Sequence, residues 1–364
     1  MELFPDERKR YSQDNLSARE AQRQAEYIAW APVIFQVSRL MLKYGILARL
    51  RDSMDGMTLN EIRAAAGLST YATKILLEAS LSAGTILIDP ETDKYTISKT
   101  GYFLLTSDFT RADLDFNHDV NYRGLFYLDE ALEQGRPAGL KTLGDWPTIY
   151  EGLSQLPPQV QKSWFGFDHF YSDSSFDEAL KIVLSKNPRK LMDVGGNTGR
   201  FALNCVERSQ DVNVTIVDLP GQIGMMKENI KGKAGAERIS GFATNMLKEE
   251  NRLPKDEWDA IWMSQFLDCF SEDEIYMILR KAAEVMTPQT TLYIMETFWD
   301  RQKYETSSLC LTMTSVYFTV MANGNSKMYH SDDMAQVISR AGLKVKAVHD
   351  GIGLGHTILE VGKE

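Results

Sequence analysis

A glycine-rich stretch is the part of the sequence best suited to ligand chemistry. It reads DVGGNTG and places Gly195, Gly196 and Gly199 directly after a short apolar segment. Glycine lets a chain turn sharply and lets a ligand approach the main chain closely. One apolar segment later, VTIVDLP places Asp218 where the next strand would end. Because a carboxylate there can accept hydrogen bonds from both hydroxyls of a ribose, the two motifs together predict nucleoside recognition.

The loop differs from the fingerprint of nicotinamide dinucleotide sites, which reads G-x-G-x-x-G. Its third position is Asn197, and Asp193 stands two residues before the first glycine. A carboxylate at this place suits a ligand that carries an ammonium and a sulfonium and has no pyrophosphate for the helix N-terminus to bind. The motif therefore favours S-adenosylmethionine over NAD.

The elements around the loop indicate an α/β domain. From residue 190 onward, short apolar segments alternate with amphipathic helical patterns: LMDV, VTIVD, ISGFA, WDAIWM, LYIMET, KVKAVHD and HTILEV. This alternation predicts a doubly wound, Rossmann-like parallel sheet with helices on both faces. The last two segments are close together in the chain, so they are expected to form an antiparallel hairpin at the sheet edge.

The N-terminal part predicts a mainly helical, winged-helix-like domain. Residues 25–44 have helical apolar spacing around most of the circumference, so this helix is expected to be buried, plausibly against a second subunit. A helix then begins near Thr58 and stops at Gly67, and a second runs from Ser69 to Gly84. Two short strands around the turn Pro-Glu-Thr-Asp complete the winged-helix order.

Charge argues against nucleic-acid binding by this domain. Its second helix carries Lys74 as its one basic residue and also the acidic Glu78, so it has too few positive charges to contact phosphates. The whole chain of 364 residues has a formal net charge of -10, whereas a nucleic-acid binder needs a basic surface. A role in dimerisation is therefore the preferred interpretation.

Composition is that of an ordinary globular protein of two domains, with 43% apolar and 25% charged residues. The N-terminus has no apolar signal region, and no apolar run reaches the roughly 20 residues that span a bilayer. The three cysteines match no zinc pattern, and the carboxylates form no recognisable ligand cluster. We expect a cytoplasmic protein without membrane, nucleic-acid or metal partners.

The segment from about 189 to 361, together with the helical N-terminal half, resembles the small-molecule O-methyltransferases typified by plant caffeate and flavonoid enzymes and by bacterial polyketide-tailoring enzymes. The motifs that carry the resemblance are DVGGNTG, VDLP, WDAIWMSQFLDCFSEDE, YIMET and AGL before the final hairpin. The resemblance implies an S-adenosylmethionine-dependent enzyme of secondary metabolism that acts on a hydroxyl of an aromatic or polyketide-like acceptor. It implies a dimerisation domain at 1–110, a helical connector to the acceptor pocket at 111–185 and a cofactor-binding catalytic domain at 186–364. Members are homodimers in which the N-terminal domain closes the partner's pocket.

The resemblance also assigns cofactor contacts. Asn245 and Met246 stand where the family usually has Asp-Met beside the adenine, and an amide oxygen can still accept a hydrogen bond there. Ser264 stands where many plant members have lysine. The implied cofactor-binding residues are Asp193, Gly195, Gly196, Asp218, Leu219, Asn245, Met246 and Ser264.

The main departure from the family concerns the catalytic base. The family motif L-H-D-W-S-D-E supplies a histidine, whereas this chain reads LDCFSEDE and places Asp268 and Cys269 at the His and Asp positions. An aspartate with its ordinary pKa of about 3.9 is a poor base for a phenol near 10, although burial can raise that value. Asp268 is therefore either the base or a group that only orients the acceptor hydroxyl. Glu296 matches the family acid that braces the base, while Met328 replaces the second such acid.

The remaining site expectations are weaker. His330 and His356 are possible replacement bases, since histidine titrates near neutral pH. The resemblance places acceptor-contacting residues at Trp164, Phe167, Tyr171, Met313 and Asn323, and such an aromatic wall favours a planar acceptor. Two other functions stay open: a cofactor-binding relative with hydroxylase or decarboxylase chemistry, because the histidine is missing, and a winged-helix regulator.

Overall fold

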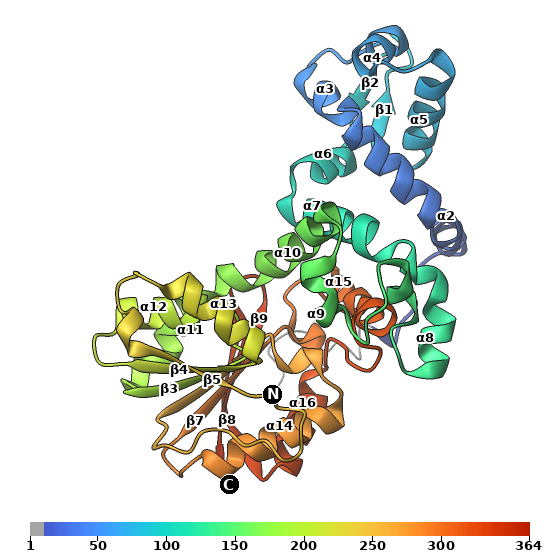
Figure 1. Cartoon of the computed structure of the whole chain (residues 1–364). Helices are drawn as coiled ribbons and strands as arrows, with labels where there is room; N and C mark the ends of the chain where they lie inside the picture. Colours follow the sequence, from blue (N-terminus) through green and yellow to red (C-terminus); the bar gives the residue numbers. More distant parts are fainter. Residues whose placement is uncertain (1–10) are drawn as a thin grey trace. The chain divides into compact units, whose positions relative to one another are not determined.

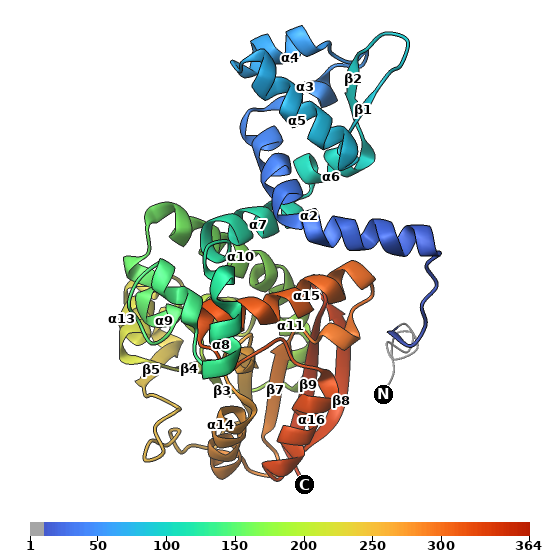
Figure 2. The ribbon, with the colours of Figure 1, turned by 90° about the vertical axis from the view of Figure 1, so that its right-hand side faces the viewer.

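The computed structural model describes residues 11–364, apart from the side chains of 169–173, and divides them into two compact units. Tyr11–His118 form the N-terminal unit, and Asp119–Glu364 form the C-terminal unit. Figures 1 and 2 show the helices of the first and the central sheet of the second.

The N-terminal unit has the predicted winged-helix order. It contains α2 (Ala18–Lys43), α3 (Ile46–Asp52), α4 (Leu59–Ala66), α5 (Thr70–Ser82), β1 (Ile86–Ile88), β2 (Tyr95–Ile97), α6 (Lys99–Thr106) and α7 (Asp108–Phe116). The predicted helix signals are confirmed: Thr58 and Glu61 form a capping box, Gly67 ends α4 with a left-handed backbone, and Ser69 caps α5. The two strands pair antiparallel.

Helix α2 differs from the expectation. It begins seven residues earlier than predicted, because Ser17 and Glu20 form a capping box at its start. Its C-terminal half contacts the core of the unit through Met41, but in its N-terminal half Ile28 and Trp30 are 69% and 59% exposed. The first half of the helix is therefore not buried within a single chain, and its expected burial against a second subunit stays a prediction.

The C-terminal unit is built on a seven-stranded sheet with the order β5-β4-β3-β6-β7-β9-β8. The strands are β3 (Lys190–Val194), β4 (Asn213–Asp218), β5 (Ile239–Ala243), β6 (Ala260–Ser264), β7 (Thr291–Glu296), β8 (Leu343–Ile352) and β9 (His356–Lys363). Strands β3 to β7 are parallel, whereas β9 is antiparallel to both β7 and β8. The expected hairpin is confirmed, and β8 is the edge strand.

Helices cover both faces of the sheet, as the alternation predicted (Figure 1). One face packs against α11 (Phe176–Val183), α12 (Arg200–Arg208) and α13 (Pro220–Ile230). The other packs against α14 (Glu272–Val285) and α16 (Ser331–Arg340). Buried apolar side chains form one cluster on each face of the sheet. Successive residues of β3 and β7 contribute to opposite clusters, because side chains alternate between the two faces along a strand.

Short helices make up the rest of this unit. They are η1 (Asn117–Asn121), η2 (Gly124–Tyr127), α8 (Leu128–Gln134), η3 (Ala138–Thr142), α9 (Ile149–Gly152), η4 (Leu153–Gln155), α10 (Pro158–Ser172), η5 (Asp173–Ser175), η6 (Leu184–Lys186), η7 (Ala236–Arg238), η8 (Leu267–Cys269), η9 (Trp299–Arg301), α15 (Glu305–Tyr317) and η10 (Phe318–Ala322). Within residues 11–364 no helix has the length and apolar character needed to cross a membrane.

The strand order locates the place where a ligand would bind. From β3 the chain proceeds outward to β4 and β5, and it then returns to β6 on the other side of β3. In open α/β sheets ligands bind outside the carboxyl ends of the strands at such a reversal. The carboxyl ends of β3, β4, β6 and β7 and the loops that follow them meet at this edge, and they carry the predicted glycines and carboxylates.

Candidate active site

The glycines after β3 are required by close packing. Gly195 and Gly199 have left-handed backbones, with φ of +76° and +79°. A Cβ at Gly195 would collide with the ring of Phe266, and one at Gly196 would lie 2.6 Å from Oδ2 of Asp193. The loop therefore lies directly on the Asp193 carboxyl and on the segment that follows β6.

Asp193 is a buried acid without a complete set of partners. It is 2% exposed, and its Oδ2 has no hydrogen-bond partner among the described residues. Burial, with a smaller effect from the charge of Asp218, raises the pKa of Asp193 to about 8. An unpaired carboxyl under a glycine loop fits a cationic ligand, and the ammonium of S-adenosylmethionine is such a group.

Asp218 lies at the end of β4 and is positioned by the main chain. Its Oδ2 accepts a hydrogen bond from the Asn197 N–H at 2.9 Å, and its Oδ1 accepts one from the Leu219 N–H at 2.7 Å. Each carboxylate oxygen has two lone pairs, so each can accept a second hydrogen bond from a ribose hydroxyl. Burial raises the pKa of Asp218. The side chain of Leu219 is exposed beside it.

The segment after β5 is anchored by a lysine that the sequence did not indicate. Oδ1 of Asn245 accepts a hydrogen bond from the Leu247 N–H at 2.9 Å, and the Met246 side chain is buried. Nζ of Lys281, which reaches from α14, donates to the carbonyls of Met246 at 2.8 Å and Lys248 at 2.5 Å. Burial lowers the pKa of Lys281. The anchored turn holds Asn245 and Met246 just after the end of β5.

The segment after β6 carries Asp268, the residue at the position of the family base. Ser264 ends the strand half-buried, and Gln265 turns the chain with φ of +45°. One oxygen of Glu296, at the end of β7, accepts hydrogen bonds from the Phe266 N–H at 3.1 Å and the Leu267 N–H at 2.9 Å. These two hydrogen bonds fix the start of the short helix η8, which carries Asp268.

Two further side chains hold the same segment. Asn323 donates from Nδ2 to the Cys269 carbonyl at 2.6 Å, and its Oδ1 accepts from the Ser326 hydroxyl at 2.9 Å. The Tyr329 hydroxyl donates to the Phe270 carbonyl at 2.6 Å. Asn323, predicted as an acceptor contact, thus uses its amide to position the chain beside Asp268.

Asp268 and Glu296 form a buried carboxyl pair. They are 7% and 2% exposed, and within the described part of the chain Oε2 of Glu296 has no hydrogen-bond partner. Burial raises the pKa of Asp268 to about 6. Burial and the neighbouring Asp268 charge raise the pKa of Glu296 well above its ordinary value. Because burial and the charge of its neighbour both raise the pKa of Glu296, the proton of the pair favours Glu296 over Asp268.

Aromatic side chains lie next to this pair. Nε1 of Trp164, from α10, donates to the hydroxyl of the buried Tyr317 at 2.7 Å. Phe167 is half-buried on the same helix, whereas the side chain of Tyr171 lies outside the described residues. Met313 on α15 is 58% exposed, so within one chain it does not belong to the wall around Asp268.

Comparison with known proteins identifies the family. A model of the O-methyltransferase domain matches residues 171–344, and a model of the Dimerisation2-like domain matches residues 22–95. The chain thus combines a Dimerisation2-like domain with an O-methyltransferase domain. L-tyrosine C(3)-methyltransferase from Streptomyces lavendulae is 20% identical over 300 residues, which cover 81% of this chain and 80% of the relative.

Solved structures of methyltransferases share the fold of this methyltransferase. The S-adenosylmethionine-dependent methyltransferase SibL superposes with a TM-score of 0.69 at 19% identity, covering 93% of this chain and 98% of SibL. The O-methyltransferase NcsB1, solved with S-adenosylmethionine and 2-hydroxy-5-methyl naphthoic acid, gives a TM-score of 0.65 at 18% identity, covering 91% of this chain and 96% of NcsB1.

Neither of the two candidate histidines, His330 and His356, is placed to replace the base. Nδ1 of His330 accepts a hydrogen bond from the Asp332 N–H at 3.0 Å and caps α16. Thr357 is the pairing partner of Glu296, so the preceding residue, His356, points to the opposite face of the sheet. His356 is also fully buried, which lowers its pKa to about 4. Asp268 is the titratable group that remains at the position of the family base.

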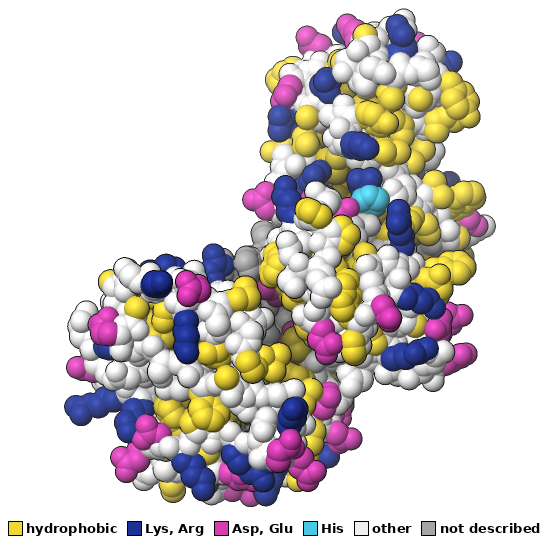
Figure 3. All heavy atoms as spheres, viewed as in Figure 1, with side chains coloured by type: hydrophobic (Ala, Val, Ile, Leu, Met, Phe, Trp, Pro, Cys, Tyr) yellow, Lys and Arg dark blue, Asp and Glu magenta, His cyan; other side chains and the backbone are white. Residues whose placement is uncertain are grey.

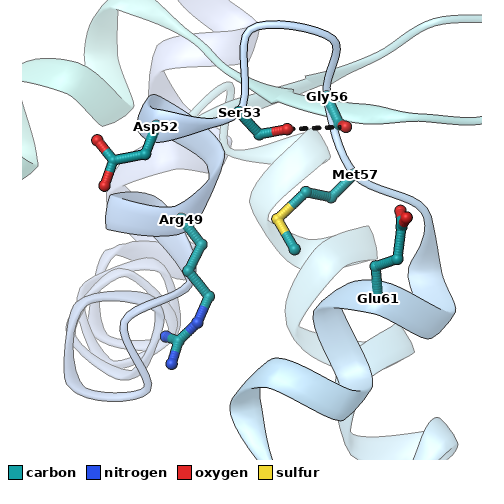
Figure 4. Close-up of a pocket in the computed structure, with 6 residues that line it drawn as sticks. All are labelled: Arg49, Asp52, Ser53, Gly56, Met57 and Glu61. Atoms are coloured by element: carbon teal, nitrogen blue, oxygen red, sulfur yellow. Dashed lines mark hydrogen bonds between the residues drawn. The ribbon is translucent and has the colours of Figure 1, made fainter.

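Elsewhere in the described residues, one further pocket can be compared with this site. A shallow pocket in the N-terminal unit is lined by Arg49, Asp52, Ser53, Gly56, Met57 and Glu61 (Figure 4). Arg49 donates to main-chain carbonyls, Ser53 bonds the Gly56 carbonyl, and Glu61 caps α4, so these polar groups serve the local fold. Among the described residues no group of His, Cys, Asp and Glu could hold a metal ion. On the face shown in Figure 3, basic and acidic side chains are intermixed.

Proposed function

We propose that the methyltransferase moves the sulfonium methyl group of S-adenosylmethionine to a hydroxyl of an aromatic or polyketide-like small molecule, with Asp268 as the general base. The observation that carries the proposal is the buried Asp268–Glu296 pair. Burial brings the pKa of Asp268 to about 6, so this carboxyl is ionised at neutral pH and is a stronger base than an exposed aspartate. It also favours the base over the purely orienting role.

Each residue then has a defined task. Asp193 and the loop at Gly195 and Gly196 hold the methionine part of the cofactor, and Asp218 with Leu219 holds the ribose. Asn245, Met246 and Ser264 surround the adenine, with Lys281 positioning their loop. The bound cofactor supplies an electrophilic methyl group.

At the acceptor, Asp268 takes the proton of the hydroxyl. Glu296 remains protonated and fixes the segment through two main-chain N–H groups. Trp164, Phe167 and Tyr317 supply an aromatic wall for a planar acceptor.

The test is to incubate the purified protein with S-adenosylmethionine and a panel of naphthols and to measure methyl ethers and S-adenosylhomocysteine by mass spectrometry. Formation of both in equal amounts supports the proposal. Consumption of the cofactor without a methylated product, or hydroxylation or decarboxylation of the acceptor, contradicts it.

We also propose a cytoplasmic homodimer that assembles through the N-terminal unit. Ile28 and Trp30 leave a large apolar surface on α2, and the Dimerisation2-like model matches this part of the chain. Sedimentation should give twice the mass of one chain, and Trp30→Glu should give the mass of one. A monomeric wild-type protein would contradict the assembly.

A further inference from the structure

The thiol of Cys269 lies against the carboxyl of the proposed base. Both residues belong to the short helix η8, and Sγ of Cys269 donates a hydrogen bond to Oδ1 of Asp268 at 3.5 Å. Burial, followed by the charge of Asp268, raises the pKa of the Cys269 thiol well above its ordinary value, so the sulfur keeps its proton. Because an ionised carboxylate can only accept hydrogen bonds, this bond runs from the thiol to Asp268.

Two neighbouring residues hold the thiol in this position. Asn323 donates from Nδ2 to the Cys269 carbonyl at 2.6 Å and so fixes the main chain. The hydroxyl of Tyr150, on α9, is hydrogen-bonded to the thiol, and this bond acts to raise the pKa of the phenol and to lower that of the thiol. The phenol is therefore the donor and the sulfur the acceptor. The result is a directed chain of hydrogen bonds from Tyr150 through Cys269 to Asp268, in which each donor polarises the next.

The other titratable side chains around Asp268 and Cys269 are acids and buried phenols. They are Glu296 on β7, Asp168 on α10, Tyr317 on α15 and Tyr329 before α16. No described lysine, arginine or histidine is among the groups that act on Asp268. Its ionised form is stabilised by the Cys269 thiol and by main-chain N–H groups of η8. Among the described residues, the thiol is thus the side chain that favours the charged form of Asp268.

We propose that Cys269 is a positioning residue whose S–H group holds the Asp268 carboxylate in its ionised, oriented form, with Tyr150 fixing the thiol from the other side. The inference rests on the proposed function, because it takes Asp268 as the base. A thiol suits this position. A carboxyl at residue 269 would add a further negative charge beside Asp268 and Glu296, whereas a neutral donor stabilises the ionised base.

Infrared spectroscopy observes this bond without turnover, because S–H stretching bands lie in a spectral window with few other protein bands. Spectra of the purified protein are recorded from acid to neutral pH, and the band of Cys269 is isolated by subtracting the spectrum of Cys269→Ser. The band should move to lower frequency as Asp268 ionises, with a midpoint near pH 6. Asp268→Asn should abolish this pH dependence, because the amide has no charge to gain.

The pH profile of kcat for a naphthol then measures the effect on the base. In Cys269→Ala the ionised carboxylate loses a donor, so the inflection should rise from near pH 6 by about half a unit to one unit. Cys269→Ser keeps a donor and should stay within about 0.3 unit of the wild type. Tyr150→Phe should give a smaller rise, and no further rise when it is added to Cys269→Ala.

Cys310→Ala is the matched control, because Cys310 is also half-buried and is not among the groups that act on Asp268. Its inflection should equal that of the wild type, and unchanged binding of S-adenosylhomocysteine shows that each variant is folded. A Cys269 band that ignores pH, an unmoved inflection in Cys269→Ala, or equal shifts in Cys269→Ala and Cys269→Ser would overturn the role of the thiol. A band that follows the ionisation of Asp268 in a protein without methyl transfer would instead contradict the proposed function and leave the thiol bond supported.

Discussion

The carboxyl pair gives the sharpest contrast between two conservative substitutions. Asp268→Asn removes the group that accepts the proton, whereas Glu296→Gln replaces a protonated acid with a neutral amide of the same shape. The amide oxygen can still accept the N–H groups of Phe266 and Leu267. The first variant should lose about 10²–10⁴-fold in kcat, and the second should stay within about threefold of the wild type.

The size of the effect follows from the shifted pKa of Asp268. A proton transfer from a phenol of pKa about 10 to an ordinary aspartate is uphill by about 6 units, or ~8 kcal/mol. Burial raises the pKa of Asp268 from 3.8 to about 6. This reduces the difference to about 4 units, or ~5 kcal/mol. Because the base form exists above that pKa, kcat should fall about tenfold per pH unit below pH 6.

The assay is kcat against pH from 4.5 to 8 for the wild type and both variants, with S-adenosylhomocysteine affinity as the control for folding. The wild type and Glu296→Gln should share an inflection near pH 6. A loss of less than about tenfold in Asp268→Asn would show that Asp268 only orients the hydroxyl. An inflection lowered by more than about one unit in Glu296→Gln would show that Glu296 is ionised in the wild type.

Two further predictions concern the cofactor loops. Lys281→Met leaves two main-chain carbonyls without their donor, so the Kd for S-adenosylmethionine in calorimetry should rise about tenfold while kcat at saturation is kept; the exposed Lys344→Met is the control. An unchanged Kd would contradict the anchoring role. Gly196→Ala forces a Cβ against the Asp193 carboxyl, so thermal unfolding should show a loss of about 1–3 kcal/mol, whereas Gly221→Ala, which meets open space, should not destabilise. Equal stability of both variants would refute the packing argument.

Local signals in the sequence predicted much of the fold. The caps at Thr58 and Ser69 and the stop at Gly67 act within four residues of the helix ends they define, so they can be found from the sequence alone. The loop at Gly195 and the acid Asp218 likewise follow from strand ends. Strand alternation predicted the α/β sheet, because the central strands β3, β6 and β7 bury both faces against helices.

Long-range contacts account for what the sequence could not show. Lys281 lies 35 residues from the Met246 carbonyl that it bonds, and its pattern on α14 is that of any helical lysine. Tyr150 lies far along the chain from Cys269, so the contact between these two side chains becomes visible only in three dimensions. His356 was a candidate base until strand pairing placed it on the opposite face from Glu296. The exposure of Ile28 depends on what covers α2, which apolar spacing alone does not encode.

The central claim is that the edge of the sheet at β3 and β4 binds S-adenosylmethionine. Isothermal titration with S-adenosylmethionine, S-adenosylhomocysteine and NAD tests it most directly, with Asp218→Ala as the matched variant. The account predicts micromolar binding of both adenosyl ligands, no binding of NAD, and loss of adenosyl binding in Asp218→Ala, because the ribose then has no carboxylate. Absence of adenosyl binding by the wild type, binding of NAD, or full affinity in the variant would contradict it.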